Sequence, residues 1–310
     1  MFTAFVNTLC GSLLTICITC LAAFAVTLIF KTSTTTNFAQ GSIAALGCYV
    51  TAELFGKYDI PVWIGVFVGM IVGILAGLFV DVVIFRRGKS VNAVGKQIIT
   101  MGLVSIIFGG IPLIFGNPES IPFEAFYNTV KAGVMPNLLV PFFGGELVIS
   151  KHALICLVIT VVVLAALFLL LKFSKWGLAV RATASNEFTA ELMGINTHVI
   201  TAMSWGIAAA LGVLAAVMYA GGGAKIGPSF MTTIQVNAFL AGILGGFSTF
   251  YGPVIGAICI PLATNCVGFL ANFGLTGITR WNNVIVYILM LIVILIKPQG
   301  LMGKKIVKKV

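Results

Sequence analysis

The feature that most constrains this chain is a series of apolar runs, many of them about 20 residues long. A helix of about 20 residues, rising 1.5 Å each, crosses the roughly 30 Å of hydrocarbon in a bilayer. A barrel strand would instead alternate apolar and polar residues over about ten positions. Lipid also requires every backbone polar group to be satisfied internally. The runs therefore predict an all-α integral membrane protein.

Nine segments qualify as candidate spans, and together they predict a single transmembrane domain over residues 1–310. Two of them, 38–56 and 231–247, fit least well. Each is also compatible with a broken or re-entrant segment, so we expect a polytopic bundle of about 8–9 transmembrane helices. The first run has no positive region before it and is too long for a cleaved signal peptide. The nine spans are 5–30, 38–56, 61–85, 97–115, 152–171, 199–221, 231–247, 253–272 and 282–296.

The distribution of lysine and arginine predicts the orientation. Nine alternating crossings place 13 of the 18 basic residues on one side, which the positive-inside rule assigns to the cytoplasm. The loops 86–96 and 172–198 and the basic tail 297–310 would then be cytoplasmic, and the loop 116–151 external. This topology, with anionic lipid, explains a net charge of +10. Nucleic acid is a poor partner, because the basic residues are scattered over separate loops.

Motifs for chemistry are missing from the sequence. The chain is only 8% charged, against about 25% in soluble domains. The Cys17-x-x-Cys20 pair is in the middle of a span, where small apolar side chains are the simpler interpretation than a redox site. We expect no metal, no bound cofactor and no enzyme activity, since neither a convergent catalytic set nor a G-x-x-x-x-G-K-[ST] loop is present. No acidic residue lies near a span centre, which weighs against a proton- or sodium-driven transporter.

Glycines recur every fourth residue in the third span. This spacing puts them on one helix face, where a neighbouring backbone can approach closely. The pattern predicts tight helix packing at Gly65, Gly69, Gly73 and Gly77.

The external loop 116–151 contains four prolines and three glutamates. Prolines prevent a continuous helix, and loops of this length often carry function. The loop is either a docking site for an external partner or a passive connector.

The sequence of the loop 172–198 predicts a short capped helix. Ser185 or Asn186 suits its N-cap, Glu187 its first turn, and Gly194 a left-handed residue after its end. The predicted helix has about two turns and is roughly 10 Å long. Phe188 and Leu192 are four residues apart and share one face. This apolar face either contacts a partner protein or lies on lipid.

Polar residues at the start of two short spans are candidates for a path through the membrane. The two spans are similar, which suggests an internal repeat with a path where the repeats meet. The alternative is hydrogen bonding between helices without substrate contact. The candidates are Asn37, Gln40 and Ser42 in the second segment, and Gln235 and Asn237 in the seventh.

Four segments, in order along the chain, resemble the permeases of branched-chain amino-acid ABC importers. Residues 36–49, TNFAQGSIAALGCY, resemble the N-F-A-x-G signature of that family, and residues 184–196, ASNEFTAELMGIN, resemble its coupling-helix loop. Residues 239–256, FLAGILGGFSTFYGPVIG, and 297–303, KPQGLMG, resemble two later signatures. The chain departs from the family pattern at Lys225, which puts a charge near the outer mouth, and at Phe188 and Thr189.

The resemblance implies a permease subunit of an ATP-driven importer in the bacterial inner membrane, most simply for leucine, isoleucine and valine. It implies a paralogous second permease, an extracytoplasmic substrate-binding protein, and two cytoplasmic ATPase subunits that hydrolyse the ATP. Urea, nucleoside or sugar permeases of the same superfamily, and a secondary transporter, remain as alternatives. The residues that would couple to the ATPase are Ser185, Asn186, Glu187, Phe188, Ala190, Leu192, Gly194, Ile195 and Asn196.

Overall fold

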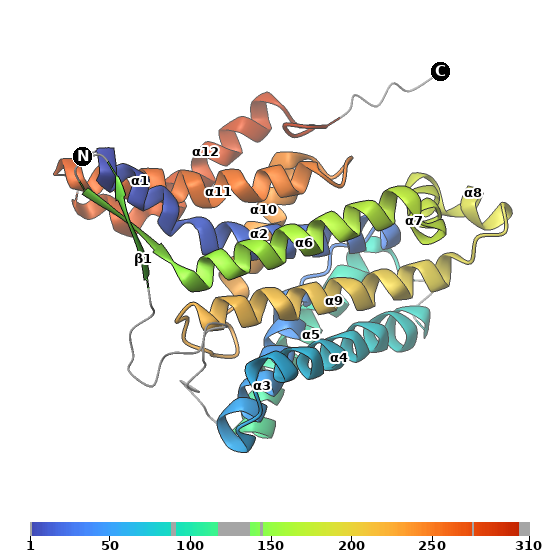
Figure 1. Ribbon diagram of the computed structural model, residues 1–310. Coiled ribbons are helices and arrows are strands. Elements are labelled where there is room, and N and C mark those ends of the chain that lie inside the picture. The colour runs from blue at the N-terminus through green and yellow to red at the C-terminus, as the bar shows by residue number, and fades with distance from the viewer. Residues whose placement is uncertain (1, 88–90, 117–136, 143–144, 275, 304–310) are drawn as a thin grey trace.

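The computed structural model describes residues 2–87, 91–116, 137–142, 145–274 and 276–303. The basic tail after Gly303 and much of the loop 116–151 lie outside these residues. Within them the chain is a bundle of long helices, many of which run roughly parallel (Figure 1). Seven helices or helix pairs of the described chain are long and apolar enough to cross a membrane, as an all-α polytopic protein requires.

The first span is broken near its start. A single helix over 5–30 was predicted, but the structure has α1 (Phe2–Gly11) and α2 (Leu13–Ser33), separated at Ser12. Gly11 has low helix propensity, and the Ser12 hydroxyl donates back to the carbonyl oxygen of Leu9 at 2.5 Å. Together the two helices form one candidate span, Phe2–Ser33.

The two segments that fitted least well differ from the other spans in the structure too. Helix α3 (Gln40–Tyr58) replaces 38–56, and helix α10 (Thr232–Gly245) replaces 231–247. Neither is among the seven long apolar spans, and α10, with 14 residues, is only about 21 Å long. Irregular chain precedes both helices, at 34–39 and 222–231.

The other predicted spans are helices with slightly shifted ends. The span 61–85 is α4 (Val62–Phe79) continued by a π-helix, η1 (Val80–Phe85), which the sequence did not predict. The rest are α5 (Ala93–Phe115), α6 (Lys151–Phe173), α9 (Thr197–Gly221), α11 (Gly252–Phe269) and α12 (Asn282–Ile296), with short 3-10 turns at Leu270–Phe273 and Thr276–Trp281.

The core forms around α2 and α9, which pack against each other and are buried over most of their length. Helices α3 and α4 cover one side of α9, and α10 and α11 pack against α2. The two most buried helices therefore connect the α3/α4 side of the bundle to the α10/α11 side.

The loop 116–151 ends in a β-hairpin that the sequence did not predict. Strands β1 (Asn137–Phe142) and β2 (Gly145–Ser150) pair antiparallel, with Asn137 opposite Ser150. The Asn7 amide clamps β2 to α1, because its Nδ2 donates to the Glu146 carbonyl oxygen and its Oδ1 accepts from the Val148 N–H, both at 3.0 Å. This hairpin lies at the end of the bundle opposite α7 and α8 (Figure 1).

Candidate functional site

The loop 172–198 folds into two short helices, α7 (Lys175–Ser185) and α8 (Glu187–Leu192). Helix α7 was not predicted. Its Ser174 cap accepts a hydrogen bond from the Gly177 N–H at 2.9 Å. A Cβ on Gly177 would overlap the backbone of Leu170 and Leu171, so α7 is packed directly against the end of α6.

Helix α8 begins at an asparagine cap. Of the two residues proposed for this role, Asn186 is the cap, since its Oδ1 accepts from the Thr189 N–H at 3.0 Å, and Ser185 is the last residue of α7. Glu187 lies in the first turn. The helix has six residues and is about 9 Å long, slightly shorter than predicted.

The end of α8 is fixed by Gly194. This residue has φ +82°, a conformation that disfavours any residue with a Cβ. The Ile195 N–H then donates to the Ala190 carbonyl oxygen at 3.0 Å, and Asn196 caps α9 by accepting from the Val199 N–H at 3.3 Å. Helix α8 is thus tied at one end to α7 and α6, and at the other end to the central helix α9.

One face of α8 is apolar and exposed. Phe188 is 70% exposed and Leu192 72%, and the neighbouring Met193, which the sequence analysis overlooked, is 79% exposed. Ala190 is buried on the opposite face. Two large apolar side chains on α8, with Met193 directly after it, form a small exposed apolar surface.

A hydrogen bond from Arg86, which also pairs with Asp81 of η1, connects the other side of this loop to the end of the α4–η1 span. Arg86 Nη2 lies 3.6 Å from Asp81 Oδ2 and donates to the His198 carbonyl oxygen at 3.1 Å, which joins the end of η1 to the start of α9. A cavity of about 190 Å³ lies beside this pair, and Glu187 of α8 lines it together with Asp81 and Arg86. The π-helix that carries Asp81 is a feature often found at functional sites, and residue spacing alone did not reveal it.

Three of the five polar path candidates form one hydrogen-bonded cluster between α3, α9 and α10. Asn37 Nδ2 donates to Gln40 Oε1 at 3.2 Å, and Gln40 Nε2 donates to the Ala208 carbonyl oxygen at 2.6 Å. Gln235 Nε2 donates to the Asn37 carbonyl oxygen at 3.1 Å. All three side chains are buried.

The two remaining candidates have different surroundings. Ser42 lines a cavity of about 90 Å³ together with Gly41 and Gln235. Asn237 lies apart from the cluster and accepts a hydrogen bond from the Tyr287 hydroxyl of α12 at 2.9 Å. The structure therefore brings Ser42 beside the cluster and leaves Asn237 outside it.

The glycine face of α4 lies against α3 and α9. A Cβ on Gly69 would stand 2.5 Å from the Gly47 carbonyl oxygen, and one on Gly77 would stand 2.8 Å from the Trp205 carbonyl oxygen. Gly65 faces Thr51 and Gly73 faces Val213 in the same way. At these positions a side chain would push neighbouring backbones apart.

Within the described residues, no group of three or more histidine, cysteine, aspartate or glutamate side chains is arranged to hold a metal ion. Cys17 and Cys20 are buried free thiols.

Comparison with known proteins identifies a family over nearly the whole chain. Residues 8–295 match the family model described as the permease component of the branched-chain amino acid transport system. A probable branched-chain amino acid transport permease protein LivH of Methanocaldococcus jannaschii is 29% identical over 91% of this chain and 88% of its own length.

Two bacterial relatives extend this result. The high-affinity branched-chain amino acid transport system permease protein BraD of Pseudomonas aeruginosa is 26% identical over 94% of this chain and 93% of its own length. LivH of Escherichia coli K12 is 26% identical over 94% of this chain and 92% of its own length. No solved structure matches. The chain is a multi-pass membrane protein that belongs to the family of permease components of branched-chain amino acid transport systems.

Proposed function

We propose that this chain is one transmembrane subunit of an ATP-driven importer for leucine, isoleucine and valine. The names of its relatives, which are branched-chain amino acid permeases, support this substrate class. The observation that carries the mechanism is α8, a capped helix on which the apolar side chains of Phe188 and Leu192 are largely exposed.

Coupling follows from how α8 is held. Two cytoplasmic ATPase subunits would bind and hydrolyse ATP, and one of them would receive Phe188 and Leu192 in a groove. Because α8 is rigidly joined to α6 through α7 and to α9 through Asn196, its displacement would move both spans. The hydrogen bond from Arg86 to the His198 carbonyl oxygen would pass the same displacement to the α4–η1 span.

The translocation path would run where the starts of α3 and α10 meet. Asn37, Gln40 and Gln235 contact each other there, and Ser42 borders the adjoining cavity. At about 90 Å³ this cavity is far below the roughly 300 Å³ at which small-molecule pockets begin, so we infer that the path is closed in this conformation.

The assembly would contain further components. A second, paralogous permease would complete the path, and an extracytoplasmic binding protein would deliver the substrate to the face that carries the hairpin. The bias of basic residues towards the α7–α8 side supports a cytoplasmic position for that side and for the C-terminus.

The test is uptake of radiolabelled leucine by cells that depend on this importer. Phe188→Asp puts a charge on the docking face, and Gly194→Pro removes the left-handed residue that ends α8. Each should abolish uptake while the protein remains in the membrane at normal amounts, as measured by immunoblot. The control Phe188→Leu keeps the face apolar and should retain most uptake. Normal uptake with Phe188→Asp would contradict the proposed coupling role of α8.

A further inference from the structure

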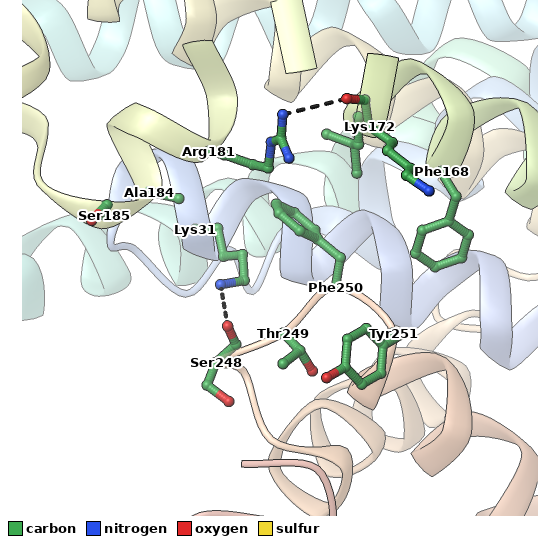
Figure 2. A pocket seen from close by; sticks show the side chains of 11 residues that line it. Lys31, Phe168, Lys172, Arg181, Ala184, Ser185, Ser248, Thr249, Phe250 and Tyr251 are labelled. Atoms are coloured by element: carbon green, nitrogen blue, oxygen red, sulfur yellow. Dashed lines mark hydrogen bonds between the residues drawn. The ribbon is translucent and has the colours of Figure 1, made fainter. Parts of the chain in front are cut away.

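A cavity of about 740 Å³ in the described part of the chain is separate from the polar path. It lies between the ends of α2 and α6, helix α7, and the link between α10 and α11 (Figure 2). The proposed coupling mechanism uses only Ser185 among its lining residues. The cavity lies at the same end of the bundle as α7, since Arg181, Ala184 and Ser185 of that helix line it.

Three cations from three separate segments line this cavity. Lys31 comes from α2, Lys172 from α6 and Arg181 from α7, and no aspartate or glutamate is among the lining residues. None of the three forms an ion pair with a carboxylate in the described residues. Three positive charges line one concave site without a carboxylate from the described residues beside them.

Backbone carbonyls contact Lys31 and Arg181, and aromatic rings contact Lys31 and Lys172. Lys172 Nζ lies 5.1 Å from the centroid of the Phe173 ring. Lys31 Nζ donates to the Ser248 carbonyl oxygen at 2.8 Å and lies 5.0 Å from the centroid of the Phe250 ring. Arg181 Nη2 donates to the Lys172 carbonyl oxygen at 3.4 Å, as Figure 2 shows. These contacts position the side chains and leave their charge unneutralised.

The cavity borders a surface suited to lipid tails. Phe168 and Leu171 of α6 line it, and on the same helix Leu169, Leu170 and Phe173 are exposed. Lys172 lies within this apolar stretch, between Leu171 and Phe173, at the end of the span. An anionic group here would sit at the depth of lipid headgroups, with apolar side chains beside it for the acyl chains.

The charge pattern distinguishes between anions. An amino acid carries an ammonium as well as a carboxylate, and the lining offers its ammonium no carboxylate partner. A lipid phosphate needs only cations and hydroxyl donors. The lining offers the three basic residues as cations and the hydroxyls of Thr249 and Ser185 as donors. We propose that this cavity binds the phosphate-bearing headgroup of an anionic membrane lipid.

The experiment uses the full chain, purified in mild detergent with whatever subunits remain bound. Native mass spectrometry then measures binding of added phosphatidylglycerol or phosphatidylcholine. Phosphatidylglycerol should bind and zwitterionic phosphatidylcholine should bind much more weakly. The affinity for phosphatidylglycerol should fall about fivefold in each of the single variants Lys31→Gln, Lys172→Gln and Arg181→Gln. It should fall about 100-fold in the triple variant. Lys175→Gln is the matched control, an exposed lysine on α7 outside the cavity lining, and should change nothing.

The outcomes separate the sources of the anion. Unchanged binding in the single variants, or equal binding of the two lipids, would overturn the proposal. Displacement of the lipid by millimolar inorganic phosphate would also overturn it, since the site would then be one for free phosphate. The single variants keep the test decisive if the triple variant fails to fold. Because lipid binding is measured without transport, the result is independent of leucine uptake.

Discussion

Helix α9 and the segment Gly277–Ile296, which contains α12, are equally apolar but have opposite surroundings. Their most apolar 18-residue stretches have the same mean hydropathy, yet 78% of the residues are buried in α9 and 11% in the segment with α12. Hydropathy predicts that both lie in the membrane. It does not predict which of them forms the centre of the bundle.

The difference follows from side-chain size. Helix α9 is rich in alanine and glycine, whereas α12 is almost entirely isoleucine, leucine and valine after its first residues. Lipid tails are as apolar as leucine, so large aliphatic side chains gain little by leaving lipid. Small residues allow backbones to approach, and close packing then selects α9 for the centre. The glycine face of α4, which lies against α3 and α9, follows the same rule.

The strongest test of this comparison places a large residue on the glycine face. Gly69→Leu should destabilise the bundle by more than about 3 kcal/mol, because the new side chain would be driven into the backbone at Gly47. We expect little folded protein in the membrane, measured by fluorescence-detected size exclusion. The control is Gly102→Leu in α5, where a Cβ would meet nothing within 4 Å. Equal yields from the two variants would break the comparison.

A second test exchanges residue size between the two helices. Ala209→Leu in α9 should cost about 1–3 kcal/mol, since Ala209 is buried against Gly77. Ile292→Ala in α12 should stay within about 0.5 kcal/mol, because this side chain is 46% exposed. Thermal midpoints in the same detergent give the ranking. A larger loss for Ile292→Ala would show that the face of α12 is packed against protein.

The third and smallest expected effect concerns polar contacts. Gln40→Leu removes bonds to Asn37 and to the Ala208 carbonyl oxygen in the buried cluster, and should cost about 1 kcal/mol. Gln97→Leu in α5 removes one partly exposed bond to Thr36 and should cost less. Thermal midpoints measure the stability, and leucine uptake measures the role in the path. Normal uptake with Gln40→Leu would leave this cluster a purely structural one.

Much of the fold could be predicted from local sequence. The apolar runs located the spans, and the Asn186 cap and Gly194 located α8, because caps and left-handed glycines act within a few residues. The two spans that fitted least well, now α3 and α10, are the ones outside the set of seven long apolar helices.

Features that depend on distant contacts could not be predicted. Helix α7 is set by the approach of Gly177 to the end of α6, and the hairpin is joined to α1 by Asn7, far away in sequence. Polarity alone likewise grouped Asn237 with Gln235, although its partner Tyr287 lies on α12. The cavity lined by Lys31, Lys172 and Arg181 could not be predicted, because these three cations are separated along the chain.

The most direct test of the account is co-purification of this chain from its native membrane in mild detergent, with identification of every bound subunit. The account predicts two ATPase chains and a second permease in stable association. It also predicts that Phe188→Asp releases the ATPase chains and leaves the second permease bound. Recovery of this chain alone, intact and monodisperse, would contradict the claim that it works as one subunit of an ATP-driven importer.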